Sequence, residues 1–266
     1  MVKDVFRVDK PIIGVVHLLP TPGSPKYRGE GIEPILRRAA KDAEALDGGG
    51  ADGIIVENYG DMPFKPTHVD PQTIAAIAIA VKEIVDSIDL PIGVNILRND
   101  AMGAMAIASV TGAQFIRINV YMETMVTDQG IINACAHELV RYRKALGVDI
   151  KILADIHVKH AISIVPRAIE EVAMDSAERG MADGLIITGL RTGAEVDLKE
   201  IAKVKGAVPD TPIFAGSGVN ATNVMEVLER CDGAIVGTDF KVEGKAENPV
   251  DKRRVKKLME FVREIR

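Results

Sequence analysis

The stretch from residue 213 to residue 239, IFAGSGVNATNVMEVLERCDGAIVGTD, is the part of the sequence that decides the fold. A short apolar run ends in Gly-Ser-Gly, a helical pattern follows, and a second apolar run ends in Gly-Thr. Apolar runs this short, separated by a helix, indicate parallel strands that are buried on both faces. The stretch therefore predicts a strand–helix–strand unit of an α/β protein.

The same unit repeats along the whole chain of 266 residues. The predicted strands are residues 11–17, 53–57, 91–96, 115–120, 150–156, 184–188, 212–215 and 233–236. The predicted helices are residues 32–47, 71–87, 100–110, 130–146, 166–180, 195–205, 220–230 and 248–264. Eight units favour closure into a (β/α)8 TIM barrel, with one domain over residues 1–266. The alternative, an open doubly wound sheet, calls for a Gly-x-Gly-x-x-Gly turn after the first strand, which is missing.

Glycines mark the joints between the predicted helices and strands. Ala-Asp-Gly at 51–53 and 182–184, and Cys-Asp-Gly at 231–233, each come directly before a strand. A glycine after a helix supplies the left-handed or tight turn that returns the chain to the sheet. We therefore expect these glycines to act as turn residues.

Composition narrows the class of protein. The chain has 33 Lys and Arg against 38 Asp and Glu, a net charge of −5, and no basic block of the kind that binds nucleic acid. Its two cysteines lie apart in apolar stretches and are expected to be free thiols. No signal core is present, and no apolar run reaches the ~18–20 residues needed to span a bilayer. We expect a cytoplasmic protein without a membrane span, and a homo-oligomer.

Polar residues stand at the carboxyl ends of six successive predicted strands, where barrels of this kind carry their active sites. Because side chains alternate between the two faces of a strand, these residues are expected to top an otherwise apolar interior. They are His17, Glu57, Asn95, Arg117 with Asn119, Asp155 with His157, and Thr188. Two structural alternatives to a functional role stay open. His17 could be a purely structural histidine, and Glu57 and Arg117 could form an ion pair inside the barrel.

The last two strand ends predict a phosphate site. Gly216 and Gly218 allow backbone N–H groups to approach an anion closely, and Ser217 adds a hydroxyl. Gly237 and Thr238 complete the cradle from the neighbouring strand, and Asn220 is expected to cap the next helix. Phosphate sites in these barrels are frequently built from the loops after strands seven and eight.

These residues predict an enzyme that acts on a small phosphorylated molecule, either a sugar phosphate or a nucleotide-like compound. Asp155 and His157 are the predicted general base and acid, with Glu57 as a second carboxylate. His17, Asn95, Arg117, Asn119 and Thr188 are predicted to bind substrate. Lyase, isomerase and glycosidic cleavage chemistry all fit this set of residues.

Two features of this predicted site stay open. Lys159 is expected to be a phosphate or carboxylate clamp, with a Schiff-base lysine as the alternative. No cofactor is predicted, although Glu57, Asp155 and His157 form the one set suited to a divalent metal. No close ligand spacing supports such a metal site.

The chain resembles the BtpA/SgcQ family of predicted TIM-barrel proteins over nearly its whole length. The matching stretches are GVVHLLPTPGSP (14–25), GADGIIVENYGDMPF (50–64), ADIHVKHA (154–161), Thr188-Gly189, GSGVNATNV (216–224) and VGTDFKVEG (236–244). The resemblance implies a TIM barrel. It also implies an alternative to the enzyme, a non-catalytic binding or assembly factor of the BtpA type, which serves photosystem I biogenesis in photosynthetic relatives. In that alternative the barrel mouth is not needed.

Overall fold

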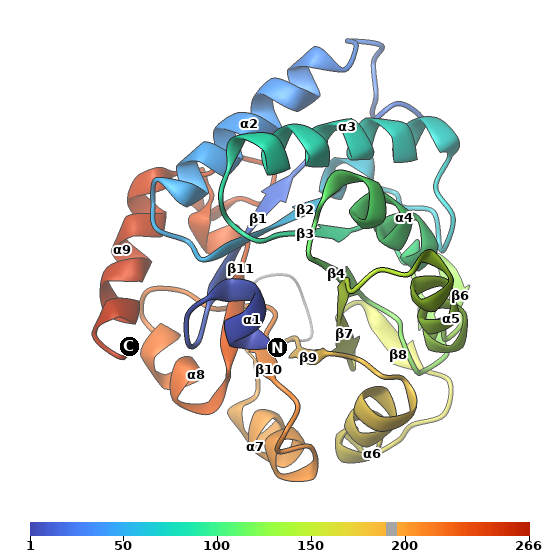
Figure 1. The fold of residues 1–266 in the computed structure, drawn as a ribbon, viewed down its shortest axis with the longest axis vertical. Coiled ribbons are helices and arrows are strands. Elements are labelled where there is room, and N and C mark those ends of the chain that lie inside the picture. The colour runs from blue at the N-terminus through green and yellow to red at the C-terminus, as the bar shows by residue number, and fades with distance from the viewer. Residues whose placement is uncertain (190–195) are drawn as a thin grey trace.

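Eight parallel strands close into a barrel in the computed structural model, which describes residues 1–189 and 196–266 (Figure 1). The strands are β1 Ile12–His17, β2 Gly53–Glu57, β3 Ile92–Asn95, β4 Phe115–Ile118, β7 Lys151–Ile156, β9 Gly184–Ile187, β10 Ile213–Ala215 and β11 Gly233–Val236. The barrel closes where β1 pairs with β11, in a register that sets Ile12 beside Ala234. The predicted TIM barrel is confirmed, and the open sheet is excluded.

The helices cover the outside of the barrel. They are α2 Glu33–Asp47, α3 Pro71–Ser87, α4 Ala101–Thr111, α5 Ala136–Leu146, α6 Ile169–Met174, α7 Leu198–Ala207, α8 Val224–Arg230 and α9 Lys252–Arg263. The prediction of a helix over 130–146 was wrong at its start, because residues 130–132 form a strand. A π-helical turn, Asp175–Arg179, continues α6. Residue 195, the predicted start of α7, lies outside the described residues.

A short N-terminal helix, α1 (Val2–Phe6), covers the end of the barrel where the strands begin. This helix was not predicted. In Figure 1 it lies in the middle of the ring of strands. Its Phe6 ring packs edge-on against Phe115 at a centroid distance of 5.3 Å and lies 6.2 Å from Phe214. These aromatic rings, with inward aliphatic side chains from the strands, form the inner core of the barrel.

The joint glycines have a different role from the predicted one. None of Gly53, Gly184 and Gly233 has a positive φ, so they are not left-handed turn residues. A Cβ atom on Gly53 would lie 2.8 Å from the Phe6 ring, and one on Gly233 would lie 2.7 Å from Phe214. All three glycines begin their strands, and Gly53 and Gly233 leave room for aromatic rings at the end of the barrel where the strands begin.

The aspartates of the same joints connect neighbouring strands. The carboxylates of Asp52, Asp183 and Asp232 accept hydrogen bonds from amides at the start of the adjacent strands, at 2.8, 2.9 and 2.8 Å. The donors are the backbone N–H groups of Ile12, Ile152 and Ile213. Each aspartate thereby satisfies a strand-end donor that would otherwise lack a partner.

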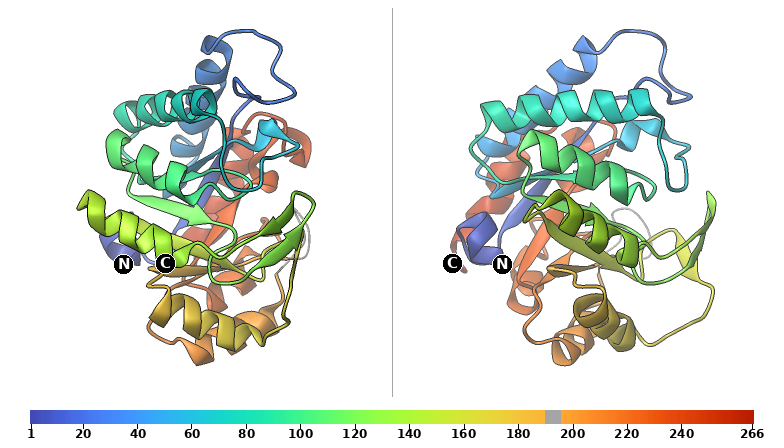
Figure 2. Two further views of the ribbon diagram at one scale, coloured as in Figure 1. Left: turned by 90° about the vertical axis from the view of Figure 1, so that its right-hand side faces the viewer. Right: turned by 45° about the vertical axis from the view of Figure 1, so that its right-hand side comes forward.

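A second, three-stranded antiparallel sheet lies at the end of the barrel opposite the termini (Figure 2). It consists of β5 Met125–Thr127, β6 Gly130–Ile132 and β8 Ala161–Ser163. Val126 of the central strand is paired with Ile131 and Ile162, and these three side chains are exposed.

The homo-oligomer stays a prediction. Among the described residues, no helix combines the length and the apolar character needed to cross a membrane.

Candidate functional site

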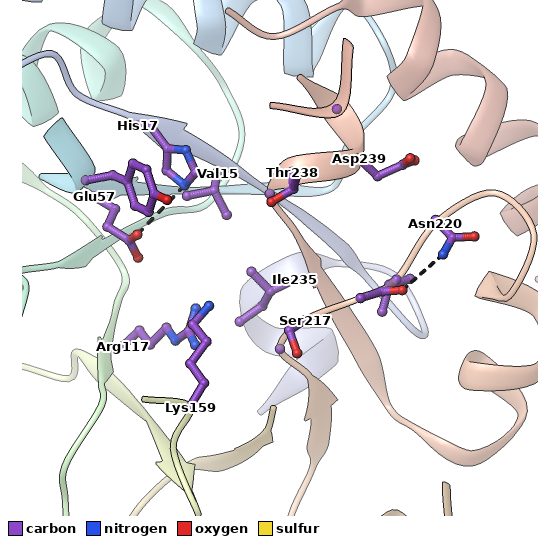
Figure 3. Close-up of a pocket in the computed structure, with 16 residues that line it drawn as sticks. Val15, His17, Glu57, Arg117, Lys159, Ser217, Asn220, Ile235, Thr238 and Asp239 are labelled. Atoms are coloured by element: carbon purple, nitrogen blue, oxygen red, sulfur yellow. Dashed lines mark hydrogen bonds and ion pairs between the residues drawn. The ribbon is translucent and has the colours of Figure 1, made fainter. Parts of the chain in front are cut away.

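A cavity of about 210 Å³ lies at the carboxyl ends of the barrel strands. It is lined by Val15, His17, Glu57, Tyr59, Arg117, Lys159, residues 216–220, Ile235, residues 237–239 and Gly244. All five predicted phosphate-binding residues are among them, together with four of the other predicted site residues. Figure 3 shows His17, Glu57, Arg117 and Lys159 on one side of this cavity, and Ser217, Thr238 and Asn220 on the other.

The glycine side of the cavity presents backbone N–H groups. Gly218 has a φ of +69°, a conformation that L side chains rarely adopt. Among the described residues, no hydrogen bond engages the amides of Gly218, Gly237 or Thr238. A Cβ atom on Gly237 would lie 3.8 Å from the His17 ring, so its missing side chain keeps this part of the cavity open. Backbone amides without protein partners are suited to binding an anion.

Side chains fix the loop that carries these amides. The Ser217 hydroxyl oxygen accepts a hydrogen bond of 2.6 Å from the Gly189 amide. The Asn220 amide group donates to the Gly218 carbonyl at 3.1 Å, and its oxygen accepts from the Thr222 amide at 2.9 Å. The prediction that Asn220 caps a helix was wrong, because α8 begins only at residue 224 and follows Asn223. The cradle thus depends on loop amides rather than on a helix terminus.

His17 ends β1 with a neutral imidazole. Its Nδ1 lies 2.7 Å from the Ala246 carbonyl oxygen, which only accepts, so Nδ1 carries the proton and Nε2 is the free acceptor. Burial, together with the charge of Lys241, holds the pKa of His17 well below its usual value. Nε2 lies 3.8 Å from Glu57 Oε1, and the ring stacks on Tyr59 at 4.4 Å. The site therefore contains a base that is unprotonated at neutral pH.

Arg117 and Asp155 form a buried, bidentate ion pair beneath the mouth of the barrel. The Arg117 Nε and Nη2 atoms donate to the two Asp155 carboxylate oxygens, each at 2.9 Å. Asn119 donates a third hydrogen bond to Asp155 at 2.9 Å, and Asn95 donates to Asn119 at 3.1 Å. Of these four residues, Arg117 alone lines the cavity. Asp155, Asn119 and Asn95 lie behind it and fix its position.

Lys159 reaches the cavity from the loop after β7. Its backbone amide donates to the Thr188 hydroxyl at 3.1 Å, and its carbonyl accepts from Arg98 Nη2 at 2.6 Å. Burial and the neighbouring Arg117 charge lower the pKa of Lys159 to about 8. Thr188 does not line the cavity itself, and its hydroxyl holds the backbone from which Lys159 extends.

His157 does not continue the strand face that it was expected to share with Asp155. β7 ends at Ile156, and His157 has a φ of 50°, so the alternation of the strand stops there. His157 is absent from the lining of the cavity. Within residues 1–189 and 196–266, no group of three or more His, Cys, Asp or Glu side chains is placed to hold a metal ion, so Glu57, Asp155 and His157 are not gathered.

Several groups that line or support the cavity were missed from the sequence. Tyr59 lies in the short helix η1 (Tyr59–Asp61) just after β2, beyond the alternation that located Glu57. The Ala246 carbonyl comes from a loop 229 positions away from His17, and a backbone atom carries no sequence signal. The cluster of Asn58, Asp61 and Thr21 binds the loops behind the mouth together through hydrogen bonds of 2.7–3.0 Å.

The fold and the site define a closed β/α barrel with one charged wall and one glycine-rich wall facing a cavity at its mouth. The sequence pattern of the BtpA family matches residues 8–264, and the chain belongs to this family. An uncharacterised protein of Thermococcus kodakarensis is 44% identical over 97% of each chain. The photosystem I biogenesis protein BtpA of Synechocystis is 42% identical over 97% of this chain and 90% of its own.

Solved structures share the fold at low sequence identity. A structure named native KDPGal superposes with a TM-score of 0.59 and 15% identity, covering 98% of both chains. N-(5'-phosphoribosyl)anthranilate isomerase from Pyrococcus furiosus gives a TM-score of 0.58 and 16% identity, over 96% of this chain and 99% of that one. These likenesses support the barrel architecture.

Proposed function

We propose that the chain is an enzyme that acts on a small phosphorylated molecule by general acid/base chemistry. One observation carries the proposal: the amides of Gly218, Gly237 and Thr238, which have no partner among the described residues, face the same cavity of about 210 Å³ as a neutral histidine. An anchored phosphate orients the reacting end of a substrate toward the groups across the cavity. The names of barrel neighbours such as phosphoribosylanthranilate isomerase are consistent with this class of substrate.

In this proposal the side of the cavity formed by residues 216–218, Gly237 and Thr238 binds phosphate. The side formed by His17, Glu57, Arg117 and Lys159 performs the chemistry. The amides of Gly218, Gly237 and Thr238 receive the phosphate oxygens, whereas the Gly216 amide already donates to the Ile187 carbonyl at 2.8 Å. His17 Nε2 is the general base, and Glu57, 3.8 Å away, is its partner carboxylate. Arg117 stabilises negative charge that develops on a substrate oxygen. Asp155 is a positioning residue, because its carboxylate is already engaged by three donors.

The size of the cavity favours one of the two predicted kinds of substrate. Sites for drug-sized ligands measure roughly 300–1,000 Å³. A cavity of about 210 Å³ is smaller than this range and matches a phosphorylated sugar or a smaller compound better than a nucleotide. We therefore place sugar phosphates ahead of nucleotide-like compounds.

Ligand-induced thermal stabilisation tests the anchor. A sugar phosphate at about 100 times its Kd is expected to stabilise the protein by ~2.7 kcal/mol, which raises Tm by roughly 5–10 °C. The same sugars without phosphate are the matched ligands and should leave Tm unchanged. An equal rise with the unphosphorylated sugars would contradict a phosphate anchor.

A turnover assay on the same panel of sugar phosphates tests the chemistry. The His17→Gln variant keeps a polar side chain but lacks the base, so we expect it to lose activity by about 10²–10⁴-fold while its ligand-induced Tm shift persists. Glu33→Gln, an exposed change at the start of α2, is the matched control and should keep full activity. Full activity in His17→Gln would remove the histidine from the mechanism.

The second candidate function is a non-catalytic assembly factor, which the name of the Synechocystis relative favours. It predicts that the mouth is dispensable. Complementation of a strain lacking this protein separates the two functions. If the protein is an assembly factor, His17→Gln and Gly237→Leu should both restore the phenotype. Failure of both folded variants to complement supports the enzyme.

A further inference from the structure

Two lysines are buried in this barrel, and their surroundings differ. Lys241 is completely buried, donates to the Val15 carbonyl at 2.7 Å and lies 3.6 Å from the Asp42 carboxylate. Lys159 extends into the cavity, and its ammonium nitrogen makes no hydrogen bond or salt bridge to any described residue. Lys241 is thus a structural cation, whereas the Lys159 nitrogen is available to a bound molecule.

The backbone around Lys159 aims its side chain. Thr188 and Arg98 bind its amide and its carbonyl, at 3.1 and 2.6 Å, so both sides of the residue are fixed to neighbouring strands and loops. Across the cavity lie Ser217 and Thr238, as Figure 3 shows. A molecule with its phosphate on the glycine side therefore presents its other end to the Lys159 nitrogen.

The surroundings of Lys159 make its neutral amine more accessible than that of an ordinary lysine. Burial disfavours the ammonium most, Arg117 and Arg98 repel it, and Glu57 and Asp155 partly offset this by attracting it. Asp155 is already paired with Arg117 in two hydrogen bonds, which leaves less negative charge for the lysine. A lysine serving only as a phosphate clamp would be expected among groups that keep it charged, whereas a nucleophilic lysine needs the opposite.

We propose that Lys159 is a nucleophile that forms a Schiff base with the carbonyl carbon of a phosphorylated aldehyde or ketone. The proposal rests on the phosphate anchor of the proposed function and narrows its substrate to carbonyl compounds. It also replaces the expected clamp with a covalent role for the same side chain.

The step is balanced without any oxidant or reductant. The neutral Nζ attacks the carbonyl carbon, forming a C–N bond, and one proton moves from nitrogen to the former carbonyl oxygen. A second proton, taken from solvent, lets that oxygen leave as water while the C–O bond breaks. The product is a protonated imine, which withdraws electrons from the adjacent carbon, where His17 Nε2 is placed to take up a proton.

Reductive trapping tests the proposal on the whole protein. Glycolaldehyde phosphate is the probe, unphosphorylated glycolaldehyde is the matched compound, and cyanoborohydride converts any imine into a stable secondary amine. Intact mass and peptide mapping should show one adduct on Lys159, at least tenfold more with the phosphorylated probe and suppressed by inorganic phosphate. Its rate should rise with pH through about 8, the pKa of Lys159.

The variants distinguish a failure of this step from a failure of the anchor. Lys159→Arg keeps a positive charge and should give no phosphate-dependent adduct, whereas Lys256→Met, a change of an exposed lysine on α9, should still give it. Phosphate-induced stabilisation without any adduct on Lys159 overturns the Schiff base and leaves the proposed function standing. Absence of both overturns both. Adducts spread over surface lysines, equally with either probe, also overturn the Schiff base.

Discussion

The two walls of the mouth solve the problem of binding charge in different ways. The wall formed by β10 and β11 contains glycines and offers backbone N–H groups, with Gly218 in the left-handed region. The wall formed by β1, β2, β4 and the loop after β7 carries ionisable side chains. Arg117 of this wall and Asp155 of β7, which lies behind it, have side chains only 4% and 0% exposed. The glycine wall is suited to binding the charge of a ligand, whereas the buried charges of the other wall must be neutralised by partners within the protein.

This difference gives the two walls different sensitivities to substitution. Backbone amides on a glycine loop do not titrate, so their ability to bind an anion does not depend on their own protonation. A substitution in this loop affects the binding of an anion rather than a contact inside the protein. Buried charges depend on their partners, and removing one of them leaves the other without compensation. Substitutions in the charged wall should therefore cost stability, and those in the glycine wall should cost binding.

The largest expected effect belongs to Asp155→Asn. It leaves the buried Arg117 guanidinium without its carboxylate, and we expect a loss of about 3–5 kcal/mol in the free energy of unfolding. Urea denaturation measures this loss. The double change Asp155→Leu with Arg117→Met removes both charges and should recover much of it. A change below 1 kcal/mol in Asp155→Asn would show that the pair is not the constraint described here.

Gly237→Leu tests the other wall. The new side chain fills the space beside His17, where even a Cβ atom would be 3.8 Å from the ring. We expect binding of sugar phosphates to weaken by about 100-fold or more, a change of ~2.7 kcal/mol. Titration calorimetry measures the affinity, and Gly237→Ala, which fits without overlap, is the control. Undiminished binding in Gly237→Leu would place the phosphate elsewhere.

A smaller effect concerns the pH dependence of the charged wall. The pKa of His17 lies below its unfolded value of about 6.5, so the unfolded state binds more protons as the pH falls. Stability should therefore decrease below pH ~6.5, by at most about 1.4 kcal/mol per pH unit from this group. The difference in unfolding free energy between the native protein and His17→Gln, followed from pH 7.5 to 5, isolates it. An unchanged difference would mean that His17 is not held neutral.

The sequence predicted the barrel and its inward-facing residues because both follow from simple periods. Alternation along each strand located His17, Glu57 and Arg117, and paired glycines located the 216–218 turn. Alternation stops where a strand stops, so His157, one residue past β7, was placed wrongly. Pairing inside the mouth is set by three-dimensional packing. The sequence left a Glu57–Arg117 pair open only as an alternative and did not indicate the Arg117–Asp155 pair that the structure contains.

The remaining misses have the same kind of cause. α1 has five residues and no hydrophobic period, so nothing in its sequence indicated that it closes the barrel. The joint glycines were assigned to turns because the aromatic rings that occupy their missing side-chain space come from distant parts of the chain. Contacts of this kind appear only after the fold has formed.

Closure of the barrel through β1 and β11 also bears on how the protein is made. Ile12 and Ile13 pair with Ala234 and Ile235, so one edge of the first strand has no partner until the last strand has left the ribosome. Pairings this distant in sequence form late in folding. An open apolar strand edge on a nascent chain invites aggregation. The first strand, which is buried on both faces in the complete barrel, is thus the segment that most needs protection while the chain is being synthesised.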